Sequence, residues 1–106
     1  MSQNRGKMIL EAAYLTVKSG ETTQFEEAFK QASPIIASMN GYIHHELQRC
    51  LENSDNYLLL VQWETLEDHI EGFRGSDEYH QWKALLHHFY DPFPTVEHFE
   101  QVDLSS

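Results

Sequence analysis

Residues 63–89, WETLEDHIEGFRGSDEYHQWKALLHHF, contain two helix starts in succession. Thr65 supplies a side-chain acceptor for free backbone N–H groups, and acidic residues follow in the first turn. Ser76 opens a second helix in the same way, after glycines that keep the first helix short. The second helix has an apolar stripe at helical spacing, formed by Tyr79, Trp82, Leu85, Leu86 and Phe89. The stretch therefore predicts a helical segment split in two, which Asp91–Pro94 ends.

Three extended runs surround this stretch. Residues 42–50 and 56–63 precede it and flank a short polar loop, which is the pattern of a β-hairpin. Residues 95–102 follow it and alternate enough to form a final strand. We therefore expect the split helical segment to connect two strands of one sheet.

The N-terminal third of the chain adds a strand and a helix. Residues 8–17 are apolar-rich and end at a turn signal, as expected for a strand with both faces covered. Over residues 22–38, apolar residues recur at helical spacing and predict an amphipathic helix. Pro34 lacks a backbone N–H, so we expect a kink or a restart at Ser33-Pro34. Asn40-Gly41 then ends this helix.

The resulting element order is β-α-β-β-α-β, the ferredoxin-like split βαβ arrangement of the α+β class with an antiparallel sheet. We expect one domain over residues 1–106, with its core at about residues 8–102. A chain of 106 residues has the size of one domain, and nothing in it suggests two.

The charge balance bears on partners and location. Seventeen acidic residues against seven Lys and Arg give a formal net charge of −10, which disfavours nucleic acid and anionic membrane surfaces as partners. No apolar run is long enough to span a bilayer, and residues 1–7 are not followed by the apolar segment of a signal peptide. Cys50 has no second cysteine with which to pair. We expect a soluble cytoplasmic protein.

The stretch of residues 63–89 resembles the core of antibiotic biosynthesis monooxygenase domains, a family of the dimeric α/β-barrel superfamily. Ser33-Pro34-Ile35-Ile36, Gly41-Tyr42 and the ending at residues 94–99 are similar to that family as well. The resemblance implies a homodimer whose sheets pack face to face into an α/β barrel, with a pocket between sheet and helices. It also implies one of several activities: cofactor-free oxygenation of phenolic or quinone-like compounds, haem degradation, or isomerisation of small molecules.

The haem-degrading branch is disfavoured by three positions. The resemblance aligns Phe73 with a tryptophan of that branch and Lys83 with its histidine ligand. Ala13 lies near the position of its strand asparagine. All three residues depart from the haem-degrading pattern.

A dimer has support of its own in the strands. Leu10 with Ala12, and Leu58 with Leu60, place apolar residues on the parity opposite to that of Ala13 and Val61. In a lone ferredoxin-like domain only one sheet face meets the helices. The other face would be an exposed apolar patch of the kind that marks an interface.

His69 is the candidate catalytic base, because a neutral imidazole beside an aromatic ring could take a proton from a phenol. Phe73, one turn later, and Trp82 would line the substrate pocket, while Tyr14 or Trp63 would orient the substrate. The alternatives are a structural histidine that bonds a backbone carbonyl, and aromatic side chains that belong to the core.

The histidines give no metal-ligand pattern. His44-His45 are adjacent on a strand and point to opposite faces, and His87-His88 diverge on a helix. A ligand set across strands, such as His45 with His98, stays open, but no full set can be read from the sequence. We also find no nucleotide-binding motif, and expect neither a bound metal nor a cofactor.

Two functions follow. The first is a cofactor-independent monooxygenase acting on a small aromatic or quinone-like compound, with His69 as base. The second is a non-catalytic, stress-related dimer that binds a small aromatic molecule. Oxygen consumption with quinols and anthrones would distinguish them.

Overall fold

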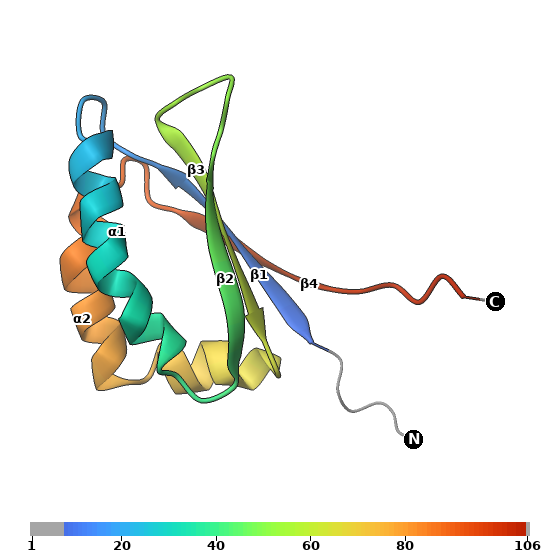
Figure 1. Cartoon of the computed structure of the whole chain (residues 1–106). Coiled ribbons are helices and arrows are strands. Elements are labelled where there is room, and N and C mark those ends of the chain that lie inside the picture. Colours follow the sequence, from blue (N-terminus) through green and yellow to red (C-terminus); the bar gives the residue numbers. More distant parts are fainter. Residues whose placement is uncertain (1–7, 106) are drawn as a thin grey trace.

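A computed structural model describes residues 8–105, and all structural statements below concern these residues. Expectations about residues 1–7 lie outside them. One four-stranded antiparallel sheet has the order β2-β3-β1-β4. The strands are β1 (Ile9–Thr16), β2 (Tyr42–Arg49), β3 (Asn56–Trp63) and β4 (Thr95–Glu100). Both long helices, α1 (Thr22–Ala37) and α2 (Asp77–Leu86), cover the same face of the sheet (Figure 1). The ferredoxin-like order predicted from the sequence is confirmed.

The split of the second helical segment is also confirmed, with a difference in detail. Its first part, η1 (Asp68–Phe73), is a π-helix, in which Arg74 N–H donates to the carbonyl of His69 at 3.1 Å. Ser76 caps α2 by accepting from Tyr79 N–H at 3.1 Å. The helix ends at Leu86, and a 3₁₀ turn, η2 (His87–Phe89), continues it. A π-helix is rare and is frequently found at functional sites.

Two boundaries differ from the sequence prediction. The helix α1 continues through Pro34 as one element, so the expected restart does not occur. The residue before the proline, Ser33, bonds its hydroxyl to the carbonyl of Phe29 within the same helix. β4 ends at Glu100 rather than at residue 102, because its partner strand β1 begins opposite, at Ile9.

The core lies between the helices and the covered face of the sheet. Helix α1 contributes Phe25, Phe29, Ala32 and Ile36, which recur every three or four residues. Along β3, every second residue is buried, from Tyr57 to Trp63. Aromatic rings meet edge to face here, for example Phe29 and Trp82 at 5.6 Å between centroids. Within residues 8–105, none of the helices is long and apolar enough to cross a membrane.

The turn between α1 and β2 brings η1 against the sheet. Gly41 has φ of +82°, a conformation that L side chains rarely adopt. A Cβ atom at this position would also collide with the side chain of Asp68 in η1. Glycine is therefore required for η1 to lie against the start of β2, next to the end of β3.

Candidate active site

His69 lies in η1 and faces the sheet, with 3% of its surface exposed. Its ring stacks on that of Trp63, with 5.5 Å between centroids and 22° between planes. The ring of Phe73 lies 6.5 Å away, and Phe73 contacts Trp82 edge to face at 5.6 Å. The structure thus brings together four of the five residues that the sequence indicated.

Glu11 on β1 is the partner of His69 that sequence reasoning missed. Its side chain is buried, with 6% of the residue exposed. Trp63 Nε1–H donates to Glu11 Oε1 at 3.0 Å, and His69 Nε2 lies 3.3 Å from the same oxygen. The indole and the imidazole therefore share one carboxyl oxygen inside the core.

His98 extends this contact toward the surface. It lies directly opposite Glu11 in the β1–β4 register, and its Nε2 is 2.8 Å from His69 Nδ1. His98 is only partly buried, unlike Glu11 and His69. The three side chains form a continuous series of contacts from a buried carboxyl to a partly buried imidazole, in which the His69–His98 contact is a hydrogen bond and the Glu11–His69 contact is a close N···O approach.

Burial controls the protonation of this chain. It raises the pKa of Glu11 to about 7, although the Trp63 hydrogen bond and the charge of Arg74 oppose the rise. Burial, together with the smaller effects of Arg74 and His98, lowers the pKa of His69 to about 3. The pKa of His98 is also lowered, chiefly by burial. Both histidines are therefore neutral near pH 7, while Glu11 is divided between its protonated and ionised forms.

This arrangement suits proton transfer. A neutral imidazole has one N–H donor and one acceptor nitrogen, so His69 can take a proton at one nitrogen and release one from the other. With its proton on Nε2, which lies 3.3 Å from Glu11 Oε1, His69 has Nδ1 free to accept from His98. A carboxyl that titrates near pH 7 is matched to general acid–base catalysis at that pH.

A cavity of about 60 Å³ lies next to Glu11 and His69, between the sheet and α2. Phe73 and Trp82 contribute its apolar wall. Arg74, Tyr79 and Tyr90 add polar groups to the lining. The cavity is well below the roughly 300 Å³ of a typical ligand pocket, so a ring-sized ligand must displace some of the lining.

Tyr14 is not part of this cavity, which corrects its assignment as a pocket-lining residue within the subunit. Side chains alternate between faces along β1, and Glu11, Ala13 and Leu15 face the helices. Tyr14 therefore faces away from them, with 45% of its surface exposed. Trp63 is at the site, but it holds Glu11 and His69 in place rather than lining the cavity.

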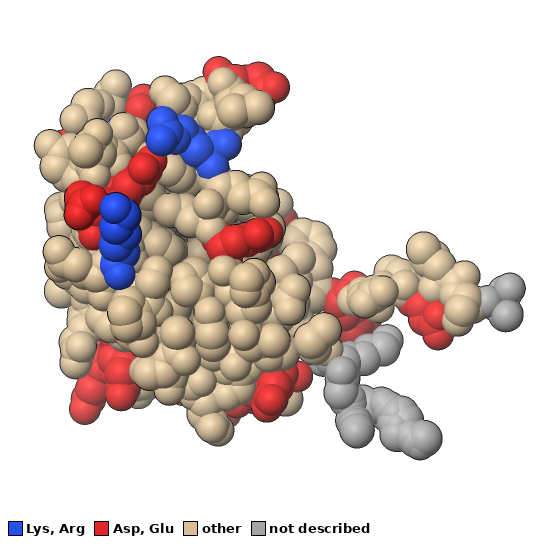
Figure 2. Space-filling view, viewed as in Figure 1, with Lys and Arg blue, Asp and Glu red and all other residues tan. Residues whose placement is uncertain are grey.

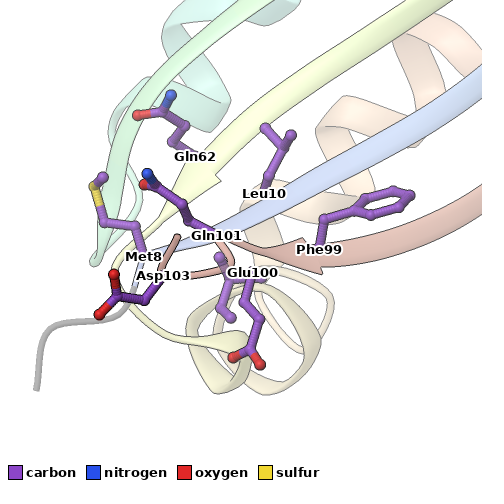
Figure 3. Close-up of a pocket in the computed structure, with 8 residues that line it drawn as sticks. Met8, Leu10, Gln62, Phe99, Glu100, Gln101 and Asp103 are labelled. Atoms are coloured by element: carbon purple, nitrogen blue, oxygen red, sulfur yellow. The ribbon is translucent and has the colours of Figure 1, made fainter. Parts of the chain in front are cut away.

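A larger hollow, of about 490 Å³, lies beside the C-terminal segment. Leu10, Gln62 and Phe99 project into it from the face of the sheet opposite the helices (Figure 3). None of its lining residues is buried. This hollow therefore lacks the desolvated acid–base groups that distinguish the smaller cavity.

The structure gives no support to a metal centre formed by side chains of residues 8–105. No group of three or more His, Cys, Asp or Glu side chains there could hold an ion. The pair His45 and His98, left open by the sequence, is separated by the sheet order, because β2 and β4 are the two edge strands.

Comparison with known proteins now identifies the family. The model of the antibiotic biosynthesis monooxygenase (ABM) family matches residues 8–85. The chain belongs to the ABM family. Among its relatives, YczJ of Bacillus subtilis, described as uncharacterized, is 64% identical over 95 residues, or 90% of this chain and 100% of YczJ.

Solved structures of ABM proteins share the fold. One from Bordetella bronchiseptica, assigned as an antibiotic biosynthesis monooxygenase, has a TM-score of 0.87 and 32% identity, covering 91% of this chain and 98% of that one. SnoaB of Streptomyces nogalater, a cofactor-independent oxygenase, has a TM-score of 0.72 and 17% identity. The match covers 94% of this chain and 96% of SnoaB. A candidate heme-binding protein of Halobacterium salinarum is 30% identical over 64 residues, 60% of this ABM chain and 13% of that protein.

Proposed function

We propose that this ABM protein is a cofactor-independent monooxygenase that takes a proton from a small phenolic or quinone-like compound. The observation that carries the proposal is the contact of buried Glu11 with buried His69, and of His69 with His98, beside a cavity. In such a reaction, the difficult step is to form an electron-rich anion that can reduce oxygen. A base in a dry cavity is the main contribution required of the protein.

Glu11 is the proton acceptor in this proposal, and His69 is its partner. A pKa of about 3 makes His69 a weak base by itself. Ionised Glu11, with its pKa of about 7, is the stronger acceptor. His69 and His98 would then pass the proton toward the surface, which restores Glu11 for another turnover.

The reaction balances without an added reductant. For an anthrone-type substrate, the reacting CH₂ group becomes a carbonyl. One atom of O₂ enters the product, and the other leaves as water with the two hydrogens of the substrate. The cofactor-independent oxygenase SnoaB has the same fold, which agrees with this reaction class but does not carry it to this chain.

Substrate entry requires movement at the corner between η1 and α2. The cavity as it stands holds only small molecules, and Arg74 and Tyr79 from this corner contribute to its lining. Arg74 is exposed, and its backbone N–H bonds to the carbonyl of His69 in the π-helical turn of η1. Outward movement of these two side chains would admit an aromatic ring beside Phe73 and Trp82.

We also propose that the protein is a homodimer formed through the open face of the sheet. Apolar side chains project from this face, among them Leu10, Leu58, Leu60, Tyr14 and Phe99. The segment after β4 extends away from the body of the subunit (Figure 1). Face-to-face packing of two sheets would cover the apolar patch and give the α/β barrel expected for the family.

Oxygen uptake with a panel of hydroquinones and anthrones tests the proposed activity. We expect turnover by the unmodified protein, and a loss of at least about 100-fold in kcat for Glu11→Gln and for His69→Ala. Glu52→Gln, at the exposed hairpin loop, is the matched control and should retain full activity. Absence of oxygen uptake with every compound that binds would instead favour the non-catalytic binding protein.

Haem degradation is tested separately. The H. salinarum relative named for heme binding is the observation in its favour. A haem macrocycle is much larger than a cavity of about 60 Å³, and Phe73 and Lys83 replace the tryptophan and histidine that the haem-degrading pattern implies. We expect no Soret shift when hemin is added to the protein.

A further inference from the structure

Three hydrogen-bond donors at the cavity have no partner within residues 8–105. They are the guanidinium of Arg74 and the hydroxyls of Tyr79 and Tyr90, all of which belong to the cavity lining. They make no hydrogen bond to Glu11 or His69, which are bonded to Trp63 and His98, although the charge of Arg74 lowers the pKa of both groups. Their shared property is that each can donate to an oxygen of a bound molecule.

Arg74 is a cation without an acidic partner among the described residues of a strongly acidic chain. The sequence has 17 acidic residues against seven Lys and Arg. Elsewhere in the described chain, Lys30 pairs with Glu27 at 3.0 Å and Arg49 pairs with Glu26 at 2.8 Å. In the view of Figure 2, the Lys and Arg groups lie beside acidic ones. Arg74, like Lys18 and Lys83, has no carboxylate within 4.0 Å among residues 8–105, and of these three it is the one that lines the cavity.

Tyr90 is the second observation, independent of Arg74. It follows η2 and is fixed by a bridge to Val17 and by its backbone bond to His87. Burial raises its pKa, so its hydroxyl stays protonated and remains a donor at physiological pH. A largely buried hydroxyl without a partner costs free energy, and a bound oxygen would recover that cost.

Tyr79 is the third of these donors, and its ring lies near a second cation, Lys83. Its ring packs edge to face on Phe73 at 5.1 Å, and the charge of Arg74 acts on its hydroxyl. The ammonium of Lys83 lies 5.5 Å from the centre of the Tyr79 ring. Lys83 also has no carboxylate partner within 4.0 Å among the described residues. Two cations without a carboxylate partner in this part of the chain, Arg74 in the cavity lining and Lys83 beside Tyr79, therefore lie near this cavity.

We propose that Arg74, Tyr79 and Tyr90 form a carboxylate-binding subsite, and that the aromatic ligand of this cavity carries a carboxylate. The planar fork of Arg74 matches a carboxylate, and charge-assisted hydrogen bonds are stronger than neutral ones. A ligand without this group would leave the donors unpaired, so the subsite discriminates against neutral analogues. The inference deepens the proposed function, because it concerns the same cavity.

Anaerobic calorimetric titration tests the subsite without any need for turnover. The probes are 2,5-dihydroxybenzoate and its neutral counterpart 2,5-dihydroxybenzamide, which share the hydroquinone ring. We expect the acid to bind at least about tenfold more tightly than the amide. Arg74→Gln should reduce this preference to about twofold, and Tyr90→Phe should weaken binding of the acid by about fivefold.

Lys18→Gln is the matched control, because Lys18 is exposed and has no carboxylate partner among the described residues. It should keep the tenfold preference, whereas a general effect of net charge would reduce it as Arg74→Gln does. Equal affinity for the two probes, no saturable binding of the acid up to about 5 mM, or an unchanged preference in Arg74→Gln would each overturn the subsite. Because oxygen is excluded, these outcomes are distinct from failure of the proposed oxygenase activity.

Discussion

The two faces of the one sheet differ in both chemistry and burial. The face covered by α1 and α2 holds the buried pair Glu11 and His69 next to a small cavity. The open face holds apolar side chains that remain partly exposed, such as Tyr14 at 45% and Phe99 at 46%. Neighbouring residues of the same strand therefore serve different roles. This difference is the basis for the proposal that chemistry takes place at the covered face and association at the open one.

The largest expected effect comes from placing a charge on the open face. Leu60 lies on β3 in the middle of this face, opposite Ala12 of β1. Leu60→Lys would bury two like charges in a symmetric dimer, so we expect the dimer dissociation constant to rise by about 1,000-fold or more. Light scattering over a range of protein concentrations measures the change.

Leu51→Lys is the control for that substitution, because Leu51 is 95% exposed in the hairpin loop. It should leave the dimer unchanged. A monomeric unmodified protein at micromolar concentration would remove the proposed role of the open face altogether.

A smaller effect is expected in the pH dependence of stability, which reflects the titration of Glu11 and His69 on the covered face. Folding raises the pKa of Glu11 from 4.5 to about 7, so between these values the folded state binds more protons. The free energy of unfolding then falls as pH rises, by about 3 kcal/mol in total. His69, lowered from 6.5 to about 3, has the opposite sign and adds stability as pH rises through that range.

In the unmodified protein these two contributions nearly cancel between about pH 4.5 and 6.5. Glu11→Gln removes the falling contribution, so stability of the variant relative to the unmodified protein should increase with pH across this window. Urea unfolding at several pH values gives the difference directly. A difference that does not vary with pH would mean that Glu11 has an ordinary pKa.

The smallest effect is expected at the corner that joins η1 to α2. Ser76 accepts from Tyr79 N–H, and its hydroxyl donates to the carbonyl of Phe73 at 2.6 Å. Ser76→Ala should lower the free energy of unfolding by about 1 kcal/mol, as is usual for loss of an N-cap. Thermal unfolding measures this loss, and Ser54→Ala in the exposed hairpin loop should have almost no effect.

The element order followed from local patterns, which is why it was predictable. Helical spacing, alternation and the Ser76 cap are properties of adjacent residues. The restart that Pro34 suggested does not occur, because α1 buries Phe29, Ala32 and Ile36 on both sides of the missing hydrogen bond and continues as one helix. The side-chain parity that separates Tyr14 from Ala13 was visible in the sequence, and applied strictly it would have excluded Tyr14 from the covered face.

The site was predictable only in part. Glu11 is the one charged residue in β1, and an isolated acid in an apolar strand was a usable signal for a buried carboxyl. Its pairing with His98 depends on the β1–β4 register, and its contact with His69 depends on how η1 folds over the sheet. These residues are 87 and 58 positions apart in the sequence, and no local pattern specifies contacts over such separations.

The central claim is that the covered face holds a carboxyl ready to accept a proton near neutral pH. Carbon-13 NMR of the Glu11 side-chain carboxyl, assigned by comparison with Glu11→Gln, tests it most directly as pH is raised from about 4 to 9. The account predicts a midpoint near pH 7, with His69 remaining neutral throughout. A Glu11 midpoint near 4.5, or a His69 that titrates near 6.5, would contradict it.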